Sequence, residues 1–293
     1  MTSDNPVHAK DLRLIGSGAT ADVYRLSDDT IVKLFKESYG EEAARYEAGI
    51  ADAVSKTAIK APRYRGMLTI DGRIGVAYDF VPGDLLFARL LAEKPRGGIA
   101  LIKKLAREHA AMHDARFDAT PSDAQRTARC SGLPSEKDRL SYLIRNAEGI
   151  DRYRPSILGW LAAREAGKSV CHGDLHCGNL IVEGNDFIAI DWMNAYAGDR
   201  AGDALRSYLM LASPFIPMPL SFPKRLAFLA YKRVLAEAYL SEYRKRSGLR
   251  RKDIRAWWPA IAAARLADRV PGESAWLLRK IKGNLWRMKG RAR

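Results

Sequence analysis

One stretch near the middle of this 293-residue chain limits its possible folds more than any other feature. Residues 171–182 read CHGDLHCGNLIV, and residues 190–192 read Ile-Asp-Trp after a second apolar run. The two apolar runs, 180–183 and 187–190, flank a Gly-Asn pair, which favours a tight turn between two strands. We therefore expect a polar loop followed directly by a short β-hairpin.

Three side chains of this stretch have a spacing typical of phosphoryl-transfer sites. Asn179 follows Asp174 by five residues, and Asp191 follows Asn179 by twelve. Asp174 would accept the hydrogen bond and then the proton of an attacking hydroxyl. The amide oxygen of Asn179 and the carboxylate of Asp191 are hard ligands suited to Mg²⁺. Any one of them alone indicates only a turn, but together they predict a kinase-type active site that uses ATP and Mg²⁺.

A glycine-rich segment, residues 16–23 (GSGATADV), lies between the first two predicted strands. Gly16 and Gly18 would let the backbone approach phosphate oxygens and offer N–H donors. Taken alone, this pattern also fits an ordinary hairpin turn. A dinucleotide-binding loop is excluded, because a strand follows the glycines and Ala21 stands where that motif needs its third glycine.

Lys33 lies in an otherwise apolar predicted strand, Ile31-Val32-Lys33-Leu34-Phe35, so its ammonium needs a cleft or a partner. It would hold the α- and β-phosphates of ATP, with a helix carboxylate to orient it. We expect that carboxylate to be Glu47, because the acids at 41–42 start the helix and already favour its dipole. A surface lysine that snorkels to solvent is the alternative.

Apolar periodicity predicts an α+β chain with two lobes. The expected strands are 12–15, 22–26, 30–35, 64–70, 73–80, 180–183 and 187–190. The expected helices are 41–56, 85–91, 99–114, 135–149, 156–165, 204–212, 224–247, 253–269 and 274–289. The break at Val81-Pro82-Gly83 separates a small antiparallel β lobe with one helix, residues 1–82, from a large, mainly helical lobe, residues 83–293. The second lobe would carry the catalytic loop, 170–203, and a basic helical segment, 221–293.

The net charge of +15 comes from the end of the chain. Residues 221–293 hold 20 Lys and Arg against 5 Asp and Glu, whereas the preceding residues nearly balance. The carboxy-terminal segment is therefore expected to form a basic surface.

The cysteines and the amino terminus indicate a cytoplasmic chain. Cys130, Cys171 and Cys177 form no regularly spaced framework, so we expect reduced thiols. The start of the chain lacks a charged-then-apolar signal pattern. A zinc site at Cys171, His172, His176 and Cys177 would require adjacent residues to bind the same ion, so no zinc is expected.

With these residues in place, the chain resembles the aminoglycoside phosphotransferase and choline kinase-like family, which has the protein-kinase-like fold. The resemblance runs from about residue 12 to about residue 211. Its most specific part is HGDLHCGN, residues 172–179, which resembles the family's catalytic loop and implies a base at Asp174 and a metal ligand at Asn179. Asp191-Trp192 resembles the family's metal-binding Asp.

Further positions follow the family pattern less strictly. Gly198-Asp199 and Asp203 resemble the family's later Gly-Asp and its structural Asp. Residues 79–83 resemble the hinge between lobes, which implies that the backbone at Phe80 and Val81 pairs with adenine. The family often has proline where this chain has Cys177, and that departure removes no catalytic group.

The positive charge of residues 221–293 bears on the acceptor and on one alternative function. A basic segment suits a small neutral or anionic hydroxyl compound better than a polycationic aminoglycoside. A different hypothesis makes residues 221–293 a surface for a polyanion, nucleic acid or membrane, with its tryptophans interleaved among basic residues. A core role for those tryptophans competes with it. A protein kinase remains another alternative, and a pseudokinase is disfavoured because Lys33, Glu47, Asp174, Asn179 and Asp191 are all present.

Overall fold

The computed structural model describes residues 7–18, 20–115 and 132–286. Predictions about Cys130 and about the basic tail after residue 286 fall outside these residues. The chain forms two compact units. The first consists of Met1–Leu85, Arg116–Leu133 and Asn179–Met193, and the second of Leu86–Ala115, Pro134–Gly178 and Asn194–Arg293.

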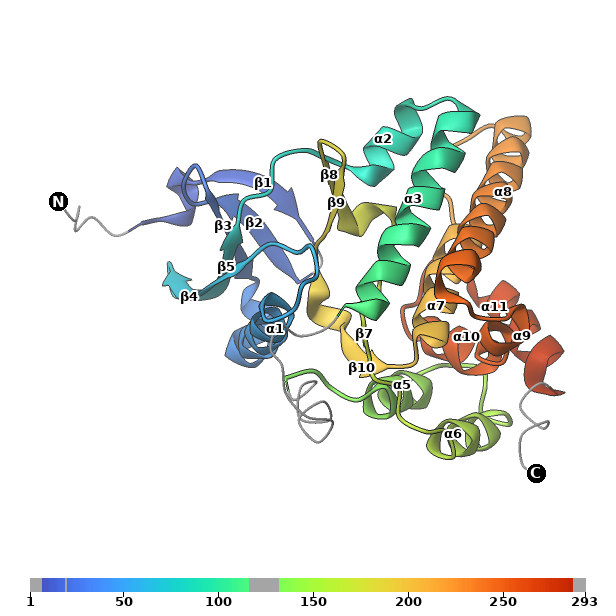
Figure 1. Cartoon of the computed structure of the whole chain (residues 1–293). Coiled ribbons are helices and arrows are strands. Elements are labelled where there is room, and N and C mark those ends of the chain that lie inside the picture. Colours follow the sequence, from blue (N-terminus) through green and yellow to red (C-terminus); the bar gives the residue numbers. More distant parts are fainter. Residues whose placement is uncertain (1–6, 19, 116–131, 287–293) are drawn as a thin grey trace. The chain divides into compact units, whose positions relative to one another are not determined.

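The first unit is built on a five-stranded antiparallel sheet in the order β1-β2-β3-β5-β4 (Figure 1). The strands are β1 (Arg13–Ser17), β2 (Ala21–Arg25), β3 (Thr30–Phe35), β4 (Tyr64–Ile70) and β5 (Arg73–Asp79). Helix α1 (Gly40–Ser55) packs against the sheet and places Ala44 and Ala48 on Phe35 and Val76. Val32 and Leu34 are buried on the other face, as alternating side chains of a strand require.

A three-stranded sheet, β6-β8-β9, completes the first unit. It consists of β6 (Asp84–Leu85), β8 (Leu180–Glu183) and β9 (Asp186–Ala189). Gly83 directly precedes β6 and has a backbone φ of +131°. A Cβ atom at this position would stand 2.2 Å from the carbonyl oxygen of Val182. Only glycine allows this close approach of the two backbones.

The second unit is mainly helical. Its helices are α2 (Leu86–Ala92), α3 (Pro95–Asp114), α5 (Glu136–Arg145), α6 (Arg154–Ala162), α7 (Arg200–Ala212), α8 (Phe222–Ser247), α9 (Arg251–Arg255), α10 (Trp258–Leu266) and α11 (Ser274–Asn284). Short 3-10 turns occur in the two units at η1 (Ala9–Asp11), η2 (Glu37–Tyr39), η4 (Cys177–Asn179) and η5 (Trp192–Asn194). A two-stranded antiparallel sheet joins β7 (Ser169–Cys171) to β10 (Tyr196–Gly198).

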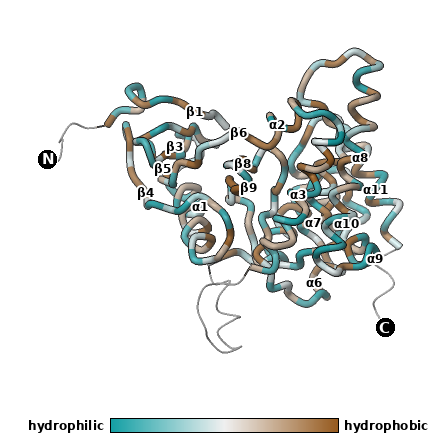
Figure 2. The backbone as a smooth tube through the Cα atoms, turned by 45° about the horizontal axis from the view of Figure 1, so that its top comes forward, coloured by the Kyte–Doolittle hydropathy of each residue, from teal (hydrophilic) through white to brown (hydrophobic). Residues whose placement is uncertain are grey.

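Helices α3 and α8 lie side by side and run in the same direction (Figure 1). His109 of α3 contacts Tyr239 of α8, and His113 contacts Tyr243 one turn further along both helices. In Figure 2 the tube changes between brown and teal within single helices of this unit, as expected of helices with one buried face.

The predicted fold class is confirmed: the chain combines an antiparallel sheet carrying one helix with a larger helical part. The predicted helix 253–269 is wrong as a single element. It is two helices, because Pro259 has no N–H to continue a preceding helix and instead stands in the first turn of α10, which begins at Trp258. Strands β6, β7 and β10 were not predicted, because runs of two or three residues have too little periodicity to detect.

The tryptophans of the basic segment divide between core and surface. Trp257 is fully buried and packs edge-on against Trp160, and Trp258 is 8% exposed. Trp286, by contrast, is 62% exposed. The first two therefore serve the core of the second unit, as tryptophans at helical positions usually do. Within the described residues, no helix is both long enough and apolar enough to cross a membrane.

We predict that Glu136, at the start of α5, makes stability depend on pH. Its side chain is buried, and burial raises its pKa from 4.5 to about 8. The folded protein thus retains a proton that the unfolded chain releases, so this stabilisation is complete below pH 4.5 and is lost as pH rises through 8. Glu136→Gln should flatten the dependence and unfold with a free energy higher by a few kcal/mol at pH 8.

Urea unfolding of both proteins at pH 5 and pH 8 measures this effect. Glu148→Gln, which alters a 78% exposed carboxylate, is the matched control and should leave the wild-type dependence intact. Equal pH dependence in wild type and Glu136→Gln would contradict the prediction.

Candidate active site

Lys33 forms the centre of a charged cluster in the first unit. Strand β3 directs its side chain, which is only 15% exposed, toward two carboxylates. The Lys33 Nζ atom lies 2.8 Å from Glu47 Oε2 and 2.9 Å from Asp191 Oδ1. Tyr78 donates a hydrogen bond of 2.8 Å to the other oxygen of Glu47. The structure thus brings together three of the residues that the sequence indicated separately.

The charge balance at Lys33 keeps the ammonium protonated. Burial alone would lower the pKa of Lys33, but the negative charges of Glu47 and Asp191 outweigh it, and the pKa is raised. Glu47 is 2% exposed, so its charge acts in a medium that screens it weakly. By contrast, Glu41 is exposed and pairs with Arg45 on the surface of the helix. A fixed cation of this kind suits phosphate oxygens.

The β8–β9 hairpin explains the spacing of Asn179 and Asp191. The Ile190 N–H donates to the Asn179 carbonyl at 3.0 Å, so the two strands end opposite each other. Asn179 is buried, whereas the side chain of Asp191 is 47% exposed and lies next to Lys33. Asp191 has a φ of +61°, an uncommon conformation for a residue other than glycine. The hairpin therefore carries an amide and a carboxylate at its open end, a donor set that suits Mg²⁺.

The other predicted nucleotide contacts also lie in the first unit. Gly16 is in β1, and the Gly18 N–H donates to the Ala21 carbonyl across the turn at 2.9 Å. The Phe80 N–H donates to the Asp29 carbonyl at 2.7 Å, and the Arg25 guanidinium stacks on the Phe80 ring. Because the Phe80 amide is engaged within the unit, pairing with adenine would depend on other backbone groups of residues 79–83, Val81 included.

The second unit holds the part of the candidate catalytic loop that contains Asp174. Gly173 has a φ of +74°, and a Cβ there would stand 2.1 Å from the Asn194 carbonyl oxygen. Asp203 of α7 accepts hydrogen bonds from the backbone N–H groups of His172 at 2.9 Å and Gly173 at 3.0 Å. The carboxylate thus fixes the backbone immediately before Asp174.

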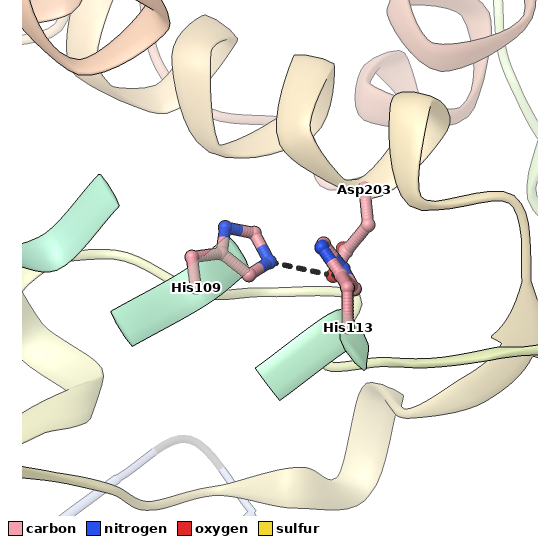
Figure 3. A group of neighbouring side chains, drawn as sticks. All are labelled: His109, His113 and Asp203. Carbon is pink, nitrogen blue, oxygen red and sulfur yellow. Dashed lines mark hydrogen bonds and ion pairs between the residues drawn. The ribbon is translucent and has the colours of Figure 1, made fainter. Parts of the chain in front are cut away.

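Two histidines of α3 support Asp203 from the other side (Figure 3). The Nε2 atoms of His109 and His113 lie 3.0 and 3.1 Å from the same Asp203 oxygen, Oδ2. Their Nδ1 atoms pair with the hydroxyls of Tyr239 and Tyr243 at 2.8 and 2.7 Å. These separations are hydrogen-bond lengths, and we interpret the group as a hydrogen-bonded brace.

The charge of this brace lies on Asp203. Burial would raise the pKa of Asp203, but the hydrogen bonds from His109 and His113 outweigh it and hold the pKa well below its usual range. Burial and the neighbouring His109 lower the pKa of His113 to about 4, so His113 is neutral at pH 7. His113 can then donate from Nε2 to Asp203 and accept from the Tyr243 hydroxyl at Nδ1.

Asp174 is paired with an arginine that the sequence did not single out. Arg206 Nη2 lies 3.2 Å from Asp174 Oδ1, and His176 Nε2 lies 3.7 Å from Oδ2. Burial would raise the pKa of Asp174, but the positive charge of Arg206, followed by those of His176, His172 and Arg265, lowers it. Asp174 is therefore ionised at neutral pH, as a residue that accepts a hydroxyl proton must be.

The two described cysteines, Cys171 and Cys177, are buried and are not joined in a disulfide. Cys177 stands in the catalytic loop, and burial raises the pKa of its thiol from 9.0 to about 12.

The cluster of His109, His113 and Asp203 was not predicted, although the histidines stand four residues apart on one helix face. That spacing is the one signal that could have indicated it.

Comparison with known proteins establishes the family. A model described as "Phosphotransferase enzyme family" matches residues 11–249. The chain therefore belongs to this family and is a phosphotransferase that acts on hydroxyl groups, as the sequence predicted. None of the curated protein sequences matches the chain.

Solved structures agree on the fold. An aminoglycoside-3'-phosphotransferase of type VIII is 18% identical, with a TM-score of 0.55 over 88% of this chain and 92% of that one. The GDP and kanamycin complex of APH(2'')-IIIa is 14% identical, with a TM-score of 0.53 over 97% and 93%. Amicoumacin kinase hAmiN, in complex with AMP-PNP, Ca²⁺ and Ami, is 16% identical, with a TM-score of 0.50 over 96% and 89%. These likenesses confirm the predicted kinase-like fold.

We predict that Asp203→Asn destabilises the second unit. An amide cannot accept from four N–H donors in a dry interior, so at least one buried donor would lose its partner. The free energy of unfolding should fall by about 3 kcal/mol. Urea denaturation measures it, with Asp186→Asn, which changes an exposed ion pair with Lys60, as the control. Equal stability of the two variants would show that the brace contributes nothing.

Proposed function

We propose that this chain transfers the γ-phosphoryl group of ATP to a hydroxyl of a small molecule that is neutral or anionic. The observation that carries the proposal is the ion-paired Lys33, held by Glu47 at 2.8 Å and by Asp191 at 2.9 Å in a phosphotransferase of this family. A strand lysine paired with a helix glutamate is the arrangement that protein kinases use to hold ATP phosphates.

The proposed roles follow the chemistry of each group. Asp174 accepts the proton of the attacking hydroxyl while the hydroxyl oxygen attacks the γ-phosphorus and ADP leaves. Lys33 holds the α- and β-phosphates, and Glu47 orients it. Gly16 and Gly18 allow the backbone near the phosphates, and the backbone around Phe80 and Val81 contacts the adenine. Residues 1–82 would form the nucleotide-binding lobe and residues 83–293 the catalytic lobe, and we place the activity in the cytoplasm.

Asn179 and Asp191 fit a magnesium ion by their chemistry. Both offer oxygen atoms, both stand at the open end of the β8–β9 hairpin, and the Asp191 side chain is 47% exposed. Mg²⁺, when bound, neutralises charge that develops on the β- and γ-phosphates. We propose that these two residues hold it.

The charges around Asp174 support the proposed acceptor class. The groups that lower its pKa are Arg206, His176, His172 and Arg265, all basic side chains. These groups oppose a polycationic acceptor only in part, because Arg206 and Arg265 are also paired with Asp268 and Glu273. Salt-bridge partners for many arginines of the basic segment, such as Glu237 for Arg251, leave less free charge for a polyanion surface. Trp257 and Trp258 are buried and so cannot stack on bases, and we therefore propose polyanion or membrane-surface contact through residues 221–293 only as a secondary role.

An acceptor panel tests the function. Mg²⁺-dependent ADP release should be measured with aminoglycosides, amino alcohols, sugars, phosphosugars and lipid head groups. We expect stimulation by a neutral or anionic hydroxyl compound that is lost in Asp174→Ala and in Asp191→Ala. Efficient turnover of kanamycin or neomycin would overturn the acceptor class, and no ATP binding or turnover would overturn the kinase assignment.

We predict that Lys33→Met raises the KM for ATP and lowers kcat/KM by about a hundredfold, because the phosphates lose a fixed cation. Lys60→Met is the matched control, since Lys60 pairs with Asp186 on the surface and should leave the kinetics unchanged. Steady-state kinetics with varied ATP distinguish the two variants. Equal kcat/KM values for them would argue against a nucleotide role for Lys33.

A further inference from the structure

A chain of ion pairs leads from Asp174 to the end of the second unit. The same nitrogen of Arg206, Nη2, lies 3.2 Å from Asp174 Oδ1 and 2.9 Å from Asp268 Oδ2. Asp268 Oδ2 also accepts from Arg265 Nη1 at 3.2 Å. Arg265 binds Glu273 through two parallel contacts, of 2.8 and 3.1 Å. Five charges of alternating sign thus follow one another from the candidate base outward.

These pairs are buried or partly buried, with Asp174 and Asp268 at 21% and 24% exposure, unlike the ordinary ion pairs of the surface. The side chains of Arg206, Arg265 and Glu273 are 6%, 11% and 2% exposed. Water and salt screen such charges weakly, so each link holds its partner in place more firmly than an exposed pair does. Arg269, the residue after Asp268, pairs with Glu148. Both side chains of that pair are about three-quarters exposed, so the pair should contribute little to stability.

The outer members of the chain of ion pairs lie beyond the family match. The match ends at residue 249, whereas Arg265, Asp268 and Glu273 belong to α10 and to the segment that leads into α11. Arg206 lies within the match, one turn of α7 after Asp203. A single turn of α7 therefore holds the loop backbone through Asp203 and the side chain of Asp174 through Arg206.

We propose that Arg206, anchored by Asp268, is a positioning residue that fixes the carboxylate of Asp174 for proton acceptance. The segment after residue 249 thereby becomes part of the catalytic apparatus. This inference rests on the proposed function, because it assumes that Asp174 is the base. Arg206 restricts the carboxylate through Oδ1, and its charge favours the ionised form. Asp268 keeps the guanidinium from turning fully toward Asp174.

Four variants test the proposal with the acceptor that the panel identifies. Arg206→Met should lower kcat by about ten- to a hundredfold and move the acid limb of kcat/KM up by about one to two pH units. The limb moves up because loss of the cation raises the pKa of Asp174. Arg206→Lys keeps the charge and should keep the limb near its wild-type position. Asp268→Ala should lower kcat about tenfold with an unchanged KM for ATP, and Glu148→Gln should match wild type.

A second measurement separates positioning from folding and from the proposed function. The ¹³C resonance of the Asp174 carboxyl, followed against pH in the protein without substrates, gives its pKa directly. We expect a higher pKa in Arg206→Met than in wild type and Arg206→Lys, with circular dichroism verifying that all three are folded. An unchanged pKa in folded Arg206→Met overturns the proposal, as does an unshifted acid limb. If wild type turns over no acceptor, the proposed function fails, and the carboxyl titration still decides whether Arg206 controls Asp174.

Discussion

The buried carboxylate of Asp203 is the interaction on which the second unit's candidate catalytic loop depends. It accepts two backbone N–H groups of the loop and two histidine N–H groups, and it has no exposed surface. A buried carboxylate is costly unless every lone pair is used. Here four donors offset that cost, and the same bonds set the course of the backbone into Asp174. Stability and the placement of the base therefore have a single physical origin.

The first unit also contains a largely buried charge, but there the charge is positive. Lys33 lies in a strand between buried apolar residues, and it keeps its charge because Glu47 and Asp191 outweigh the cost of burial. Glu47 is in turn fixed by Tyr78. A cation held in this way needs little reorganisation when an anionic ligand arrives, which is the property that electrostatic catalysis requires. Both units thus use buried charges whose partners come from distant parts of the sequence.

Much of the fold followed from the sequence, because its signals are local. The strands of the large sheet and most helices have clear periodicity, and the pairing of Lys33 with Glu47 followed from the strand and helix that carry them. The histidine brace did not, since His109 and Asp203 are 94 residues apart and only the packing of helices brings them together. Arg206 was missed for a different reason. An arginine on a helix is usually a solvated surface residue, so its side chain gave no sign of a buried pairing. The apolar periodicity of residues 253–269 did not reveal that they form two helices. That division depended on Pro259.

The state of Cys177 bears on how the loop would respond to oxidants. Peroxide reacts with the thiolate of cysteine, and a thiol whose pKa is about 12 is almost entirely protonated at neutral pH. Cys171 is equally buried. Cys177 is therefore a poor target for peroxide and for thiol-directed alkylating reagents at neutral pH.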